Sequence, residues 1–159
     1  ALYIPDGGVR NIASAQSFEM EEFEGGTKRN RTHIIIDGMR IFNFSITKVP
    51  PQIKEVLAFA KTDIENTDFF FTHQANLIMN ETIRRKLKIP IEKFPYSIAE
   101  YGNTSSASIP ITMSHFLGRS GTKFSGTAVL SGFGIGLSWA TAFCTFNNTL
   151  ILPVHDYEY

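Results

Sequence analysis

The sequence predicts an α/β domain with helices on both faces of a mixed five-stranded sheet. Short β-branched and aromatic runs alternate along the chain with segments of helical periodicity, which is typical of layered α/β folds. One run, Phe69-Phe70-Phe71, is continuously apolar, as in a strand buried on both faces of a sheet. Such a strand needs cover on both sides, so we expect three layers, α/β/α.

The first 46 residues divide into two parts. Paired glycines bracket an acidic stretch within residues 1–30, which predicts a mobile or partner-dependent lead-in. We place the domain proper at residues 31–159. Its first two strands are expected at residues 33–36 and 40–46, because Asp37-Gly38 between them favours a hairpin turn.

Two helices are expected to flank the buried strand at residues 68–72. The first begins at Pro50-Pro51, with apolar residues at i, i+3, i+4 and i+7. The second covers residues 74–87, and Pro90 follows its end. Its apolar stripe consists of Ala75, Met79, Ile83 and Leu87.

A third helix and two strands complete the predicted order. The helix follows a cluster of cap-forming residues at 101–106, and Pro110 should kink or restart it. The residues expected to face inward are Ile109, Met113, Phe116 and Leu117. The last strands, at residues 126–131 and 137–146, are joined by a glycine-rich turn.

Composition excludes several classes of function. The 159 residues suit one domain, and 15 Lys and Arg balance 15 Asp and Glu, so no basic excess favours nucleic acid. A single cysteine excludes an intrachain disulfide framework and a cysteine-based zinc site. No apolar run approaches the ~20 residues of a membrane span, and nothing marks secretion. We expect no membrane association and no metal.

His73 is the first candidate site residue. It lies where a buried strand ends and a helix begins, the edge at which open α/β sheets bind ligands. The helix dipole disfavours imidazolium there, so a neutral ring offering an N–H donor is expected. The alternative is a half-buried histidine satisfied by the backbone.

Asn103 is the second candidate, and it also precedes a helix. An asparagine at such a junction often serves only as an N-cap or in an Asx-turn. However, Thr104, Ser105 and Ser106 already supply capping oxygens. Donors at two helix N-termini could converge on one carbonyl oxygen and stabilise an enolate or oxyanion.

Three further features have weaker interpretations. Gly132, Gly134 and Gly136 form either a simple hairpin or a backbone that approaches a ligand closely. Cys144 lies in an apolar strand without a neighbouring cation, so we interpret it as a core residue and not as a nucleophile. The basic cluster at residues 84–88 suits a helix C-terminus, or the docking of an acidic protein or a cofactor phosphate.

Three segments together resemble motifs of 3-oxoacyl-acyl-carrier-protein synthase III, in the thiolase superfamily. They begin at His73-Gln74-Ala75-Asn76-Leu77, at Tyr101-Gly102-Asn103-Thr104 and at Gly132-Phe133-Gly134-Ile135-Gly136. The resemblance covers residues 34–146 and implies the C-terminal, thiolase-like half of a condensing enzyme of fatty acid biosynthesis. Such an enzyme is expected to be cytoplasmic and homodimeric, with acyl-CoA and acyl carrier protein as partners.

The resemblance also implies residue roles. His73 and Asn103 would be catalytic and would stabilise the enolate formed when malonyl-acyl-carrier protein loses CO2. Asn76 would contact the pantetheine arm, whereas Phe133, Gly134 and Ile135 would lie near the acyl pocket and the oxyanion. Arg85 and Lys86 would dock the carrier protein. Coenzyme A and phosphopantetheine thioesters would be substrates, not resident cofactors.

The chain departs from the family pattern at Ile78, where the family often has a basic residue, and at Ile135, where it usually has glycine. The N-terminal half with its nucleophilic cysteine is outside this sequence, so the chain alone is expected to be inactive. Two alternatives are a secondary-metabolite condensing enzyme that makes polyketides, quinolones or ketones, and a non-catalytic coenzyme A-binding or dimerisation module.

Overall fold

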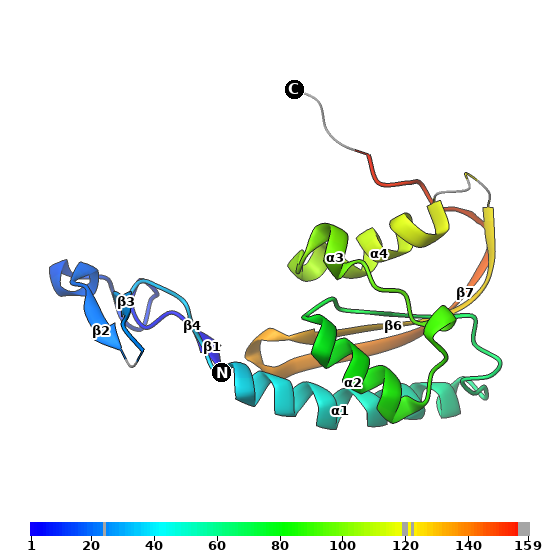
Figure 1. Cartoon of the computed structure of the whole chain (residues 1–159), viewed down its shortest axis with the longest axis horizontal. Coiled ribbons are helices and arrows are strands. Elements are labelled where there is room, and N and C mark those ends of the chain that lie inside the picture. The colour runs from blue at the N-terminus through cyan, green and yellow to red at the C-terminus, as the bar shows by residue number, and fades with distance from the viewer. Residues whose placement is uncertain (24, 119–120, 122, 156–159) are drawn as a thin grey trace.

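A computed structural model describes residues 1–155 apart from residues 24, 119–120 and 122, and apart from the side chain of Ile135. Helices α1 (Gly38–Phe59) and α2 (Leu77–Leu87) cover one face of a sheet, and α3 (Ile98–Tyr101) and α4 (Ser108–Leu117) cover the other (Figure 1). The three-layer α/β/α arrangement predicted from the sequence is confirmed. The segment before α1 extends away from these layers.

The central sheet is mixed. Strand β5 (Phe69–Thr72) runs parallel to β6 (Lys123–Gly134), which pairs with the antiparallel β7 (Ser138–Leu150). Within the described residues this sheet has three strands in the order β5-β6-β7, not the expected five. The predicted strand at 33–36 is reduced to β4 (Ile35–Ile36), which pairs with β1 (Leu2–Tyr3) outside the central sheet.

The second missing strand is part of α1. Asp37 does not turn a hairpin, because its carboxylate accepts the backbone N–H of Arg40 at 2.9 Å and caps the helix. The β-branched and aromatic residues of segment 40–46 suggested a strand, but its inward positions continue the stripe of the following helix. The buried members of that stripe are Ser45, Val49, Ile53 and Leu57. Tertiary burial of one helical face therefore overrides local β-propensity.

Helix α4 buries a face different from the one predicted. Its buried residues are Ser108, Thr112 and His115, whereas Phe116 is 44% exposed. Ile109, Met113 and Leu117 are only partly buried. The apolar stripe therefore does not define the inner face of this helix.

The hydrophobic core lies between the sheet and the α1–α2 layer. Its fully buried members come from α1, β5, α2, the segment after α2, and β6. They are Val49, Ile53, Phe70, Ile83, Ile89, Phe94 and Val129. This core fixes the end of β5 against the start of α2, where His73 lies.

The N-terminal segment contains a second strand pair, β2 (Glu21–Phe23) with β3 (Thr27–Arg29), and the short 3-10 helix η1 (Ala15–Phe18). Asp6 connects its parts, because its carboxylate accepts from Arg31 Nε at 2.7 Å and from Ser17 Oγ at 2.8 Å. The proposed domain boundary at residue 30 remains a prediction. In the part of the chain that the structure describes, no helix is long and apolar enough to cross a membrane.

Candidate active site

One cavity of about 870 Å³ brings together segments that are far apart in the sequence. The residues that line it come from the N-terminal segment and α1, the start of α2, the loop into α4, and the β6–β7 turn. They are Leu2, Ile36, Gly38, Ile41, His73, Ala75, Asn76, Met79, Asn103, Ser105, Ser106, Ser108, Ile109, Gly132, Phe133, Gly134, Ser138, Trp139 and Ala140. The predicted residues His73, Asn76, Asn103, Phe133 and Gly134 thus share one cavity.

His73 is held by both its backbone and its ring. Its N–H donates to Ser131 O at 2.8 Å, which extends the pairing of β5 with β6 by one residue. Its Nδ1 lies 2.7 Å from Ser108 Oγ. Burial lowers the pKa of His73 below 6.5, and a hydrogen bond with the Ser105 backbone partly offsets this. The ring is therefore neutral near pH 7.

Asn103 combines the two interpretations that its sequence position allowed. Its Oδ1 accepts the N–H of Ser105 at 3.0 Å, as in an Asx-turn. This bond fixes the amide so that Nδ2, the donor end, faces the segment after His73, 3.4 Å from Ala75 O. That contact is long for a hydrogen bond, so the donor is weakly engaged.

Asn76 also has a structural function. Its Oδ1 accepts the N–H of Met79 at 2.8 Å and caps α2. The residue is exposed at the cavity wall. The same capping geometry therefore brings its side chain and the N-terminus of α2 to the cavity.

The β6–β7 turn forms the wall beside His73. The Phe133 ring meets the His73 ring edge to face, with centroids 5.4 Å apart, and only 8% of Phe133 is exposed. Gly134 and Gly136 have φ of 155° and 79°, a region that favours glycine. Ile135 begins the 3-10 turn η5 (Ile135–Leu137), and its side chain lies outside the described part of the structure.

A buried polar network behind His73 was not predicted. Gln74 is fully buried; its Nε2 donates to Thr72 O at 3.0 Å and its Oε1 accepts Ser97 N–H at 3.2 Å. Ser97 Oγ lies 2.5 Å from Thr112 Oγ1, which donates to Ser108 O at 2.7 Å. These bonds connect the end of β5 to α4 and limit the movement of His73 relative to Ser108.

Asn80 was also missed. It is fully buried on α2, and its Nδ2 donates to His73 O at 3.0 Å and to Thr72 Oγ1 at 3.2 Å. Its Oδ1 has no hydrogen-bond partner among the residues described. The available sequence signal was its position three residues before Ile83, which places a polar side chain on the inward stripe of α2.

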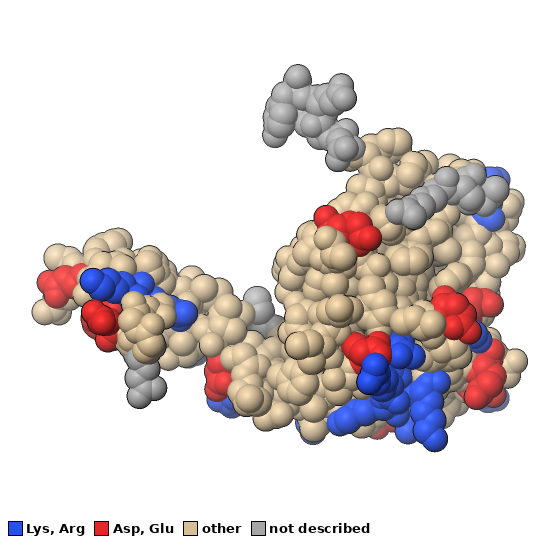
Figure 2. Space-filling model, in the orientation of Figure 1, with Lys and Arg blue, Asp and Glu red and all other residues tan. Residues whose placement is uncertain are grey.

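The two predicted docking residues, Arg85 and Lys86, lie in the last turn of α2, away from the residues that line the cavity. Lys and Arg side chains gather over this end of α2 (Figure 2). The Arg85 side chain is 75% exposed and pairs with Glu81. Lys86 Nζ donates to Ile46 O at 3.0 Å. Because Pro50 lacks the N–H that would bond Ile46 O in α1, Lys86 supplies the missing donor.

Cys144 lies in β7 opposite Ala128 and is absent from the lining of the cavity. It is partly exposed, so it is less buried than a core residue would be. Within the described ranges, no three His, Cys, Asp or Glu side chains lie close enough to hold a metal ion.

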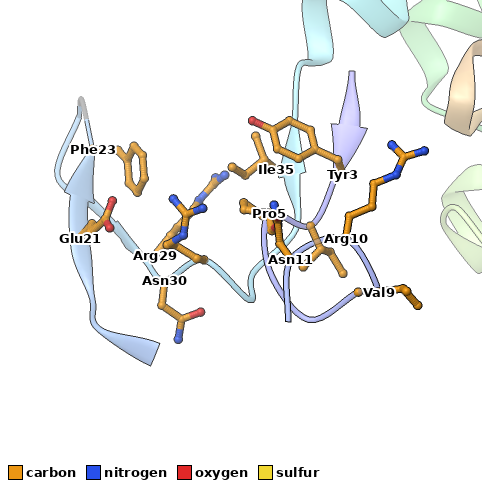
Figure 3. A pocket seen from close by; sticks show the side chains of 13 residues that line it. Tyr3, Pro5, Val9, Arg10, Asn11, Glu21, Phe23, Arg29, Asn30 and Ile35 are labelled. Atoms are coloured by element: carbon orange, nitrogen blue, oxygen red, sulfur yellow. The ribbon is translucent and has the colours of Figure 1, made fainter. Parts of the chain in front are cut away.

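A second cavity, of about 820 Å³, lies in the N-terminal segment between the β1–β4 and β2–β3 strand pairs (Figure 3). Tyr3, Phe23, Arg10 and Arg29 are among the residues around it. It shares no lining residue with the cavity at His73. His73, Asn76, Asn103, Gly132 and Gly134 therefore line the first cavity and not this one.

Comparison with known proteins gives a consistent result. A family model described as 3-oxoacyl-[acyl-carrier-protein (ACP)] synthase III C terminal matches residues 57–146. The chain is 40% identical over 118 residues to the beta-ketoacyl-[acyl-carrier-protein] synthase III of Streptococcus sanguinis. That match covers 73% of this chain and 36% of the relative.

Solved structures agree with the sequence matches. A 3-oxoacyl-(acyl-carrier-protein) synthase III structure superposes with a TM-score of 0.85 at 34% identity, covering 91% of this chain and 43% of that one. A 3-oxoacyl-(acyl-carrier protein) synthase from Burkholderia xenovorans gives 0.80 at 32% identity, covering 96% and 42%. The chain therefore spans less than half the length of the relatives that it matches.

Proposed function

Because the chain belongs to the 3-oxoacyl-[acyl-carrier-protein] synthase III family, as its C-terminal domain, we propose that it supplies the decarboxylation half of a condensing active site. The observation that carries this proposal is the convergence of His73 and Asn103 on one cavity. Each side chain is fixed by a hydrogen bond to a neighbouring serine, His73 by Ser108 and Asn103 by Ser105.

The proposed substrate is a malonyl thioester of acyl carrier protein. When its C–C bond to the carboxylate breaks, CO2 leaves and the electron pair moves onto the thioester oxygen as an enolate. N–H groups from His73 and Asn103 would stabilise this oxygen, and one such preorganised donor is worth about 10²–10³-fold in rate. The enolate carbon then attacks an acyl thioester, and a thiolate leaves as the new C–C bond forms.

The acyl group would be carried by a nucleophilic cysteine from outside these 159 residues. Cys144 is no substitute, because it lies in β7 and does not line the cavity. Asn76 and the Gly134 backbone would contact the pantetheine arm and the oxyanion, whereas Phe133 would border the acyl pocket. Arg85, exposed at the end of α2, would contact the acidic carrier protein, and the complete enzyme would be a homodimer.

The first test uses the chain by itself with radiolabelled acetyl-CoA. We expect no stable protein-bound label, because acylation lacks its nucleophile. A thioester adduct that is lost in Cys144→Ser would overturn the proposal that the nucleophile lies elsewhere.

The second test uses the polypeptide that carries the nucleophile. His73→Ala and Asn103→Ala should each abolish CO2 release from malonyl-acyl-carrier protein while acylation by acetyl-CoA continues. Asn66→Ala, an exposed change in the turn before β5, serves as the control and should leave both steps intact. Unaltered CO2 release in either site variant would remove that residue from the mechanism.

Coenzyme A titration separates an enzyme half from a module that has lost its ligand site. We expect the amide resonances of Asn76 and Gly134 to shift with coenzyme A, and not with an equal concentration of adenosine diphosphate, which lacks pantetheine. Identical responses to the two compounds would contradict the pantetheine assignment.

A further inference from the structure

Ser108 contacts the ring of His73 at Nδ1. It is 1% exposed, at the first turn of α4, and its Oγ lies 2.7 Å from His73 Nδ1. Because Nδ1 is engaged with Ser108, the remaining ring nitrogen, Nε2, is the one left to meet a ligand in the cavity.

A neutral imidazole has one N–H, so its two nitrogens cannot both donate. For His73 to stabilise an enolate oxygen, the proton must be on Nε2, and Nδ1 must then accept a hydrogen bond. The group at hydrogen-bond distance from Nδ1 is the Ser108 hydroxyl, at 2.7 Å. A hydroxyl can donate as well as accept, so Ser108 can supply the proton that an unprotonated Nδ1 needs.

The Ser105 carbonyl competes for the same hydroxyl proton, since Ser108 Oγ lies 2.8 Å from Ser105 O. That carbonyl already accepts the backbone N–H of Ser108 in the 3-10 turn η3 (Ser105–Ala107). It is therefore satisfied without the hydroxyl. The unprotonated Nδ1 of this partly buried ring would lack a donor if the hydroxyl turned away.

We propose that Ser108 is a positioning residue whose hydroxyl donates to His73 Nδ1 and so keeps the imidazole proton on Nε2, toward the cavity. This inference rests on the proposed function for its catalytic meaning, since an enolate needs the Nε2–H donor. The backbone of Ser108 is itself fixed, because its carbonyl accepts Thr112 Oγ1 at 2.7 Å. The serine thus connects the polar network of α4 to the ring of His73.

The test measures the tautomer directly, without substrate. In the chain labelled with ¹⁵N-histidine, long-range ¹H–¹⁵N spectra identify the protonated nitrogen, and His73→Gln assigns the His73 signals. We expect the proton on Nε2 in the wild type and a shift of the proton toward Nδ1 in Ser108→Ala, which removes the donor to Nδ1. Ser108→Thr, which keeps the hydroxyl, should retain the wild-type tautomer.

Ser114→Ala is the matched control, because it removes a serine hydroxyl elsewhere on α4. If Ser108→Ala does not fold, Ser108→Cys replaces it, and its weak S–H donor should give a partial shift of the proton toward Nδ1. A wild-type proton on Nδ1, or a tautomer unchanged in both variants, would overturn the proposal.

Activity then separates this inference from the proposed function. In the polypeptide that carries the nucleophile, Ser108→Ala should lower kcat for CO2 release about 10²-fold with little change in KM, and Ser108→Thr should restore it. A shifted tautomer with normal CO2 release would support the role of Ser108 and refute the proposed donor role of His73.

Discussion

Asn80 Nδ2 donates to the backbone carbonyl oxygen of His73 at 3.0 Å, so a buried amide on α2 holds the residue that ends β5. We expect Asn80→Ala to lower the free energy of unfolding by about 1–3 kcal/mol, because it leaves buried acceptors without their donor. Urea denaturation measures this loss. The His73 ring signals should also move, since its backbone is no longer held.

Ile78→Ala is the control for Asn80→Ala, because it truncates a side chain that is 74% exposed on the same helix. It should change stability by less than about 0.5 kcal/mol. Equal effects of the two variants, or an unchanged His73 spectrum in Asn80→Ala, would show that the amide does not position the histidine.

The pKa of His73 predicts a pH dependence of stability. Burial lowers this pKa below 6.5, so below that pH the unfolded chain takes up a proton before the folded chain does. The free energy of unfolding should therefore fall as the pH falls from about 6.5 toward the folded pKa. Above about 6.5 the ring is neutral in both the folded and the unfolded chain, so His73 should cause no such loss of stability there. The His73→Gln variant should not show this loss of stability, because glutamine does not titrate.

Urea unfolding of wild type and His73→Gln at about pH 7.5 and about pH 5 measures the effect. We expect the stability of the wild type relative to His73→Gln to decrease on acidification. His33→Gln, at an exposed histidine, reports the general cost of losing a histidine. Parallel profiles for wild type and His73→Gln would contradict a depressed pKa.

The sequence predicted well where one local signal agreed with tertiary burial. The continuous apolarity of Phe69-Phe70-Phe71 identified β5. The apolar stripe of segment 74–87 identified α2, although the helix begins at Leu77 and not at residue 74. The prediction of a strand at residues 40–46 was wrong because these residues favour a strand locally. Their four-residue spacing with Val49 and Ile53 becomes visible only when α1 is treated as a single helix. Asp37, a turn former, was equally suited to cap that helix.

The site was predictable only in part, because hydroxyl groups carry little sequence signal. His73 and Asn103 lie at strand-to-helix and loop-to-helix junctions, which sequence patterns reveal. By contrast, α4 turns Ser108 and Thr112 inward, against its apolar stripe, because their hydroxyls bond Ser97 and the His73 ring. Such pairing depends on contacts between segments 15 to 35 residues apart, which periodicity does not encode.

Glu81, in the middle of α2, makes a second polar cluster. Its carboxylate accepts from Arg84 Nη2 at 2.6 Å and from Tyr96 Oη at 2.6 Å. The Arg84 hydrogen bond, followed by that of Tyr96, holds the pKa of Glu81 well below its usual 4.5. We expect Glu81→Gln to lower the free energy of unfolding by about 1 kcal/mol at neutral pH, since the pair is only partly buried.

This contribution has a defined pH window. Because the pKa of Glu81 is depressed, its stabilisation is present above about 4.5 and is lost as the pH falls toward the folded pKa. The difference between wild type and Glu81→Gln in urea unfolding should therefore shrink at about pH 3. Glu55→Gln, on an exposed face of α1, is the control. A difference that does not change with pH would rule out this linkage.

Lys86 and Pro50 form the last testable pair. Pro50 leaves Ile46 O without its helical donor, and Lys86 Nζ occupies that place at 3.0 Å. We expect Lys86→Met to lower the free energy of unfolding by about 0.5–1.5 kcal/mol. In a Pro50→Ala background the restored N–H can bond Ile46 O, so the same change should cost close to nothing.

A double-mutant cycle by urea denaturation isolates this coupling. Pro50→Ala is measured with and without the Lys86 ammonium, and its packing cost is the same in both cases, so that cost cancels. Lys88→Met, an exposed lysine at the C-cap of α2, is the control and should show no coupling to Pro50. Equal costs of Lys86→Met in both backgrounds would mean that the ammonium does not replace the missing N–H. Lys86 would then be as available as Arg85 for the proposed carrier-protein surface.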